Sequence, residues 1–170
     1  MPSVGRLEVL AGKHNLGVFE EAQVRLGVDR PRSIIHPDWV SGGQVGPDDI
    51  ALLRTATAFV YTARIQPVRL PQSGSVPTGT SRLSGWGATA SGTFPTMPNI
   101  LQKAVLPVLS FAECDAALGA DNPLDVTNVC TGPLTGGVSA CSGDSGGPLV
   151  SSFNSLSSLH LMYDYFSQFY

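Results

Sequence analysis

Residues 141–149 read CSGDSGGPL, and this stretch is the most informative part of the sequence for fold and function. A serine hydroxyl is a weak nucleophile, so it must be presented on an exposed, tightly turned backbone. Glycines on both sides of Ser145 permit such a turn and let backbone N–H groups approach a substrate carbonyl closely. The N–H groups of Gly143 and Ser145 can form an oxyanion hole, in which one donor is typically worth roughly 2.7–4 kcal/mol. The alternative is a Gly/Ser-rich surface loop. Such a loop would match a bare Gly-x-Ser-x-Gly, but it does not account for the longer run of matching residues that follows Cys141.

The composition is that of a folded chain with many turns. Its 170 residues suffice for one ordinary domain or two small ones, and 42% hydrophobic residues suffice for a packed core. The 19 glycines and 13 prolines, with only 14% charged residues, indicate short strands joined by turns rather than long helices. A net charge of −3 provides no broad positive field, so nucleic acid is not expected as a partner.

Signals for membranes and secretion are not found in the sequence. No stretch approaches the roughly 20 apolar residues that span a bilayer, so no membrane partner is expected. Residues 1–8 have no continuous apolar core after a basic start, and no secretory signal is predicted in this chain. No cofactor and no metal ion are predicted either.

The cysteine count is odd, with Cys114, Cys130 and Cys141. In an oxidising compartment one pair can form a disulfide, and one thiol is then left over. The count alone does not say which pair forms.

Short apolar runs bounded by turn-forming or charged residues predict the strands. Five runs are expected to be strands: 7–10, 23–26, 50–53, 82–87 and 101–109. Pro107 in the last of them marks a strand edge or a bulge. The segment Gln66–Gly79 holds three prolines and two glycines, so it is the best candidate for a linker.

One short helix is predicted after these strands. Ser110 stands at the capping position and Glu113 follows three residues later, which is the capping-box pattern. Gly119 stands where a helix stop is expected, so the helix would be about two turns long.

The stretch around Ser145 resembles the nucleophile motif of the trypsin/chymotrypsin family of serine endopeptidases. Three other segments resemble parts of that family in the same order: the His-Pro-aromatic loop in 35–39, the segment of the catalytic aspartate in 48–53, and the Gly-Trp-Gly in 84–87. The resemblance runs from about Leu7 to Val150. It implies an all-β fold of two antiparallel Greek-key barrels, both incomplete in this chain.

The resemblance also implies a division of the chain. Residues 1–65 would form part of the first barrel, with Gln66–Gly79 as the inter-barrel linker. Residues 80–150 would form part of the second barrel, which carries the nucleophile motif. The serine- and aromatic-rich tail Ser151–Tyr170 does not resemble the family.

Catalytic roles follow from the resemblance. In the family's mechanism the residue matching Ser145 attacks the peptide carbonyl and the one matching Asp49 orients the imidazole base. Asp144 would accept the ammonium of a newly formed amino terminus, which holds the oxyanion hole open. Taken alone, Asp49 would more often be a turn or cap residue.

Further roles concern the disulfide and the specificity pocket. The resemblance pairs Cys114 with Cys130 across the short helix. Ser139 aligns with the base of the primary specificity pocket, where an aspartate would recruit Arg or Lys. A serine there suggests an apolar side chain, as in chymotrypsin- or elastase-like members. Trp86 is expected to pack in a core rather than to touch substrate.

The family's catalytic histidine is not found in this sequence. It lies in an Ala-Ala-His-Cys context, which none of His14, His36 and His160 shares. His36 lies only 49 − 36 = 13 residues before Asp49, in a segment that matches a different loop. Without a base, Ser145 keeps its proton.

These observations predict a serine endopeptidase domain that acts on peptides or proteins and is extracellular by resemblance. The chain as given is expected to be a truncated, inactive product. The alternative is a non-catalytic protease homologue that serves as a protein-binding module. A lectin-like or structural β domain would leave the serine motif unexplained.

Overall fold

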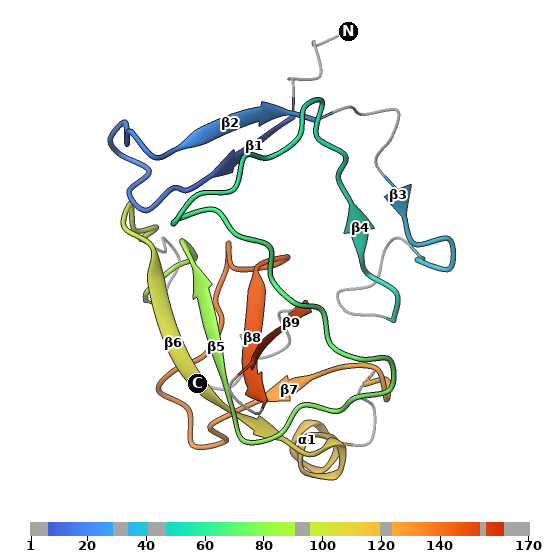
Figure 1. Cartoon of the computed structure of the whole chain (residues 1–170). Coiled ribbons are helices and arrows are strands. Elements are labelled where there is room, and N and C mark those ends of the chain that lie inside the picture. Colours follow the sequence, from blue (N-terminus) through green and yellow to red (C-terminus); the bar gives the residue numbers. More distant parts are fainter. Residues whose placement is uncertain are drawn as a thin grey trace, which may run out of the picture. The chain divides into compact units, whose positions relative to one another are not determined.

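The computed structural model describes residues 7–28, 34–40, 47–90, 96–119, 124–153 and 156–161 (Figure 1). The chain divides into two compact units, one made of residues 1–41 and 48–67, the other of residues 42–47 and 68–170. Within the described ranges, no helix has the length and apolar character that a bilayer crossing requires.

The first unit contains two small antiparallel sheets. They consist of β1 with β2 and of β3 with β4, where the strands are β1 Glu8–Ala11, β2 Val24–Gly27, β3 Ile34–Ile35 and β4 Ala51–Leu52. An isolated bridge between Val28 and Thr55 joins the end of β2 to the segment after β4. Among the described residues of this unit, Leu26, Val28 and Ile65 are the buried apolar ones.

The second unit is built on one curled antiparallel sheet (Figure 1). Its five strands are ordered β7-β6-β5-β8-β9, with β5 in the centre. The bounds are β5 Thr80–Gly85, β6 Gln102–Leu109, β7 Cys130–Thr131, β8 Pro148–Phe153 and β9 Leu156–Leu161. The prediction of an all-β fold is therefore confirmed.

The core of the second unit lies under the central strands. Leu83 on β5, Leu106 on β6 and Leu149 on β8 form it together with Ala140. Side chains alternate across a strand, so neighbours on β6 face opposite sides of the sheet. Leu106 is fully buried, whereas Val105 beside it is 58% exposed.

The single described helix, α1, spans Phe111–Leu118, as the capping pattern predicts. The Ser110 hydroxyl accepts the Glu113 N–H, and the Glu113 carboxylate accepts the Ser110 N–H. Hydrogen bonds from the hydroxyl and then from the N–H of Ser110 lower the pKa of Glu113. The buried Cys114 of α1 forms a disulfide with Cys130 of β7, with Cα atoms 6.2 Å apart, which confirms the predicted pair.

Two segments named in the sequence analysis can be located in this fold. No named strand falls within Gln66–Gly79, all of which is described. Residues 151–153 and 156–161, at the start of the serine-rich tail, lie in β8 and β9, which pair with each other from Pro148↔Leu161 to Phe153↔Leu156. Residues 162–170 lie outside the described part of the chain.

The alternation on β6 predicts two different outcomes for neighbouring substitutions. Leu106→Ala should lower the free energy of unfolding by about 2–5 kcal/mol, because it leaves a cavity among Leu83 and Leu149. Val105→Ala should change it by less than about 0.5 kcal/mol, because that side chain is largely solvated. Urea denaturation followed by tryptophan fluorescence measures both. Equal losses for the two variants would contradict this sheet register.

Candidate active site

Two consecutive tight turns immediately precede β8, and Ser145 lies on the second of them. The first turn is closed by the hydrogen bond from the Asp144 N–H to the Cys141 carbonyl, 2.9 Å, and the second by that from the Gly147 N–H to the Asp144 carbonyl, 2.8 Å. Gly143, with φ +95°, takes a left-handed conformation that residues with a side chain rarely adopt. Ser145 itself is exposed. The glycines of the motif therefore occupy the positions at which the turns require them.

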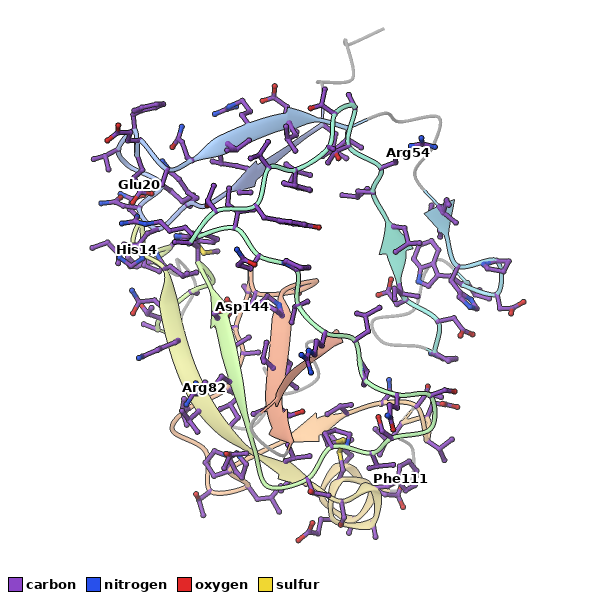
Figure 2. The ribbon with its side chains drawn as sticks, viewed as in Figure 1. His14, Glu20, Arg54, Arg82, Phe111 and Asp144 are labelled. Atoms are coloured by element: carbon purple, nitrogen blue, oxygen red, sulfur yellow. A yellow bond between two sulfur atoms is a disulfide. The ribbon has the colours of Figure 1, made fainter. Side chains whose placement is uncertain are left out.

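The carboxylate of Asp144 holds this loop against the sheet (Figure 2). Asp144 is only 9% exposed. Its Oδ1 accepts a buried hydrogen bond from the Gly87 N–H, 2.9 Å, and its Oδ2 accepts one from the Cys141 N–H, 3.1 Å. A further bond, from the Ala88 N–H to the Ser142 carbonyl, 2.9 Å, joins the same two segments. The loop of residues 141–147 is thus fastened to the residues that follow β5.

Gly85 and Gly87 leave the space that the Asp144 carboxylate occupies. A Cβ built on Gly85 would overlap Oδ1, and one on Gly87 would lie 2.5 Å from each carboxylate oxygen. Neither glycine has a positive φ, so the requirement for glycine here is steric rather than conformational. Trp86 between them is half-buried, and its Nε1–H donates to the Asn99 carbonyl at 3.1 Å.

A cavity of about 510 Å³ lies beside this loop in the second unit. Ser139, Cys141 and Asp144 are among its lining residues, together with Gly85 and Gly87. Within the described ranges no Lys or Arg contacts the Asp144 carboxylate, and its hydrogen-bond partners are backbone N–H groups. A buried carboxylate next to a cavity favours a cationic ligand, because pairing compensates a buried charge.

The Gly143 N–H is a candidate donor to an oxyanion. In the part of the chain that the structure describes, no acceptor contacts the N–H of Gly143. A donor without a protein acceptor on an exposed turn is available to a developing negative charge. Cys141 forms no disulfide, since Cys114 and Cys130 are bonded to each other.

The remaining predicted residues occupy the first unit and β9. Asp49 directly precedes Ile50, whose N–H donates to the Asp48 carbonyl at 2.8 Å and whose carbonyl accepts the His36 N–H at 3.0 Å. Asp49 belongs to the first unit and Ser145 to the second. Their pairing stays a prediction.

The three histidines have different surroundings. The backbone N–H of His14 donates to the Glu20 carboxylate at 2.7 Å. The ring of His36 lies beside Asp48, and His160 is part of β9. None of these positions was expected to supply a base for Ser145.

Sequence reasoning missed the contact between Asp144 and Gly87, which are 57 positions apart. The signal that could have indicated it is the repeated glycine on both sides of Trp86. A glycine in a strand often marks a close approach by another part of the chain.

Comparison with known proteins identifies related sequences. The family model described as Trypsin matches residues 2–162. Lectizyme of Glossina austeni is 36% identical over 153 residues, which are 84% of this chain and 53% of that protein. Trypsin-1 of Astacus astacus is 34% identical over 86% of this chain and 59% of its own length. Serine protease 1 of Rattus norvegicus is 38% identical over 85% of this chain and 56% of its own length. The chain therefore spans little more than half the length of these curated relatives.

The steric role of Gly87 predicts a specific coupling with Asp144. Gly87→Ala alone should lower the free energy of unfolding by about 1–3 kcal/mol, because the new methyl group displaces the carboxylate. In an Asp144→Ala background the same substitution should cost clearly less, since the atoms it would overlap are gone.

Denaturant unfolding of the wild type, both single variants and the double variant gives the coupling energy. Asp144→Ala is itself expected to destabilise, because it leaves the Gly87 N–H without its acceptor. Additive losses, with no coupling, would show that Gly87 is required for some other reason.

Proposed function

This chain belongs to the trypsin family of serine proteases, and we propose that it is a serine endopeptidase domain whose nucleophile is Ser145. The observation that carries this proposal is the tight turn from Asp144 to Gly147, on which Ser145 is exposed. A buried hydrogen bond from the Gly87 N–H to the Asp144 carboxylate holds this turn in place. A hydroxyl on a rigid, exposed turn can approach a carbonyl carbon without moving the backbone. Peptides or proteins are the proposed substrates, and the proposed location is extracellular.

The proposed reaction is acyl transfer in two steps. The Ser145 Oγ attacks the peptide carbonyl, its proton passes to an imidazole base, and the carbonyl oxygen becomes an oxyanion held by the N–H groups of Gly143 and Ser145. Collapse of the tetrahedral intermediate releases the amine, which takes the proton from the imidazolium. Water then hydrolyses the acyl-enzyme. Asp49 is the residue proposed to orient the imidazole.

Asp144 has a proposed role in holding the oxyanion hole in its working form. Its carboxylate lines the cavity, and within the described ranges it contacts no Lys or Arg. We propose that an ammonium group entering this cavity pairs with Asp144 and holds the oxyanion hole in its working form. The family resemblance supports this assignment, and the buried position of the carboxylate is compatible with it.

The 170-residue polypeptide on its own is proposed to be inactive. None of His14, His36 and His160 stands in the sequence context of the family's base. In a related catalytic triad, loss of the histidine alone costs on the order of 10⁶ in kcat. The alternative is that the domain binds proteins without cleaving them, and it makes the same prediction for hydrolysis.

Labelling with a fluorophosphonate tests the inactivity of this polypeptide. The reagent modifies a serine only when a base activates it, so Ser145 should remain unlabelled, and hydrolysis of peptides with apolar residues before the scissile bond should not exceed that of Ser145→Ala. Mass analysis locates any label. Labelling that disappears in Ser145→Ala would confirm the nucleophile but contradict the proposed inactivity.

A chimera tests the nucleophile and the specificity residue together. Residues 139–149 are exchanged into the matching segment of rat Serine protease 1, so that the rest of that protease surrounds them. The chimera should be labelled at Ser145 and should prefer apolar residues before the scissile bond. Ser139→Asp in the chimera should shift the ratio of kcat/KM values toward Arg and Lys by about tenfold or more.

The matched control is the same chimera with Ser145→Ala, which should be neither labelled nor active. A folded chimera that fails to be labelled would favour the non-catalytic alternative. A chimera whose preference does not change with Ser139→Asp would remove Ser139 from the specificity pocket while leaving Ser145 as the nucleophile.

A further inference from the structure

Three side chains of the first unit bring possible metal ligands together. The ligand atoms of His36, Asp38 and Asp48 all lie within 4.8 Å of one another. His36 Nδ1 and Asp48 Oδ1 lie 3.6 Å apart. His36 and Asp48 are half-buried and Asp38 is exposed, so an ion could reach the group from solvent.

Backbone pairing explains why these residues meet. Ile35 of β3 lies opposite Ala51 of β4, and the hydrogen bond from the His36 N–H to the Ile50 carbonyl, 3.0 Å, extends this ladder by one step. The extension brings His36 to the end of β4 that Asp48 precedes.

Two turns complete the arrangement. The hydrogen bond from the Trp39 N–H to the His36 carbonyl, 3.2 Å, closes a turn in which Pro37 holds the second position, as proline favours. This turn directs Asp38 back toward the imidazole, since the Asp38 N–H lies 3.4 Å from Nδ1. That long hydrogen bond uses the same Nδ1 lone pair that a metal ion would need.

The charges of the group are not balanced by protein cations. Within the described ranges, neither the Asp38 nor the Asp48 carboxylate contacts a Lys or Arg side chain. With a neutral imidazole the group therefore carries two negative charges within a few ångströms. A ring nitrogen among the donors distinguishes it from an ordinary patch of surface acids, which offers oxygen atoms only.

We propose that His36, Asp38 and Asp48 bind a divalent first-row transition-metal ion, with zinc as the ion to test. Imidazole nitrogen suits zinc and its neighbours, whereas calcium takes six to eight oxygen ligands. One nitrogen and two carboxylate oxygens leave a fourth tetrahedral position for water. Two donors on one zinc ion are on the order of 3.4 Å apart. The His36–Asp48 pair already lies close to this separation at 3.6 Å, and the ligand atoms that lie up to 4.8 Å apart would have to move closer.

Calorimetric titration of the 170-residue chain with zinc chloride tests the site. The chain carries Cys141→Ser throughout, because a free thiol binds zinc by itself. One ion per chain should bind, and His36→Gln and Asp48→Asn should each weaken the affinity by about tenfold or more. Asp48→Asn is a mild change for the backbone, since Asp48 has φ +65° and asparagine tolerates that conformation well.

The matched control is His14→Gln, which removes the exposed histidine on the loop between β1 and β2 and should leave zinc affinity unchanged. Circular dichroism establishes that each variant keeps the fold. Titration with cobalt provides an independent readout, because its visible absorption reports nitrogen and oxygen ligands and should be lost in His36→Gln.

Zinc affinity that is unchanged in a folded His36→Gln or Asp48→Asn chain would overturn the proposal, as would the absence of saturable binding. Calcium that competes with zinc at equal concentration would overturn the assigned class of ion. None of these readouts depends on Ser145, so the metal site and the proposed proteolytic function can fail separately.

Discussion

The buried hydrogen bond from the Gly87 N–H to the Asp144 carboxylate joins the nucleophile loop to the central sheet. A carboxylate with this little exposure requires donors, and the main chain at Gly87 and Cys141 provides them. Room for it exists only because Gly85 and Gly87 have no side chains. With Asp144 fixed, the next residue, Ser145, is carried outward on its turn. The presentation of the hydroxyl thus depends on the buried carboxylate of the residue before it.

The parts of the fold that local chemistry determines could be predicted. Helix α1 begins and ends as its capping residues require, and β6 lies within one residue of its predicted start. The two-residue strands β3 and β7 could not be predicted, since segments that short have no periodicity and exist only through their partners. The composition of Ser151–Tyr170 indicated a boundary and predicted no strand there, whereas residues 151–153 and 156–161 pair in β8 and β9. Pairing of this kind depends on the neighbouring strand, which composition does not report.

In the candidate site, too, the residues of a contiguous motif could be predicted, whereas contacts between distant segments could not. Residues 141–149 revealed Ser145 and its glycines because the whole motif is contiguous, and the roles of Asp144 and Ser139 came from resemblance to a family. The steric reason for Gly87 depends on a contact across the unit, and the glycines on both sides of Trp86 indicate a close approach without identifying Asp144 as the partner. His36 and Asp48 stand 48 − 36 = 12 positions apart, with no spacing typical of metal ligands, and only the pairing of β3 with β4 brings them together.

The disulfide between Cys114 and Cys130 closes a covalent ring of backbone that includes most of α1 and the segment leading to β7. A single cut of the main chain inside that ring would not separate the molecule into two. The two fragments would remain covalently linked until a reductant cleaved the disulfide. The relatives of this domain include proteases, so a proteolytic cut between Cys114 and Cys130 is a relevant form of damage. After such a cut the two fragments would stay linked by the disulfide, and gel electrophoresis would separate them only under reducing conditions.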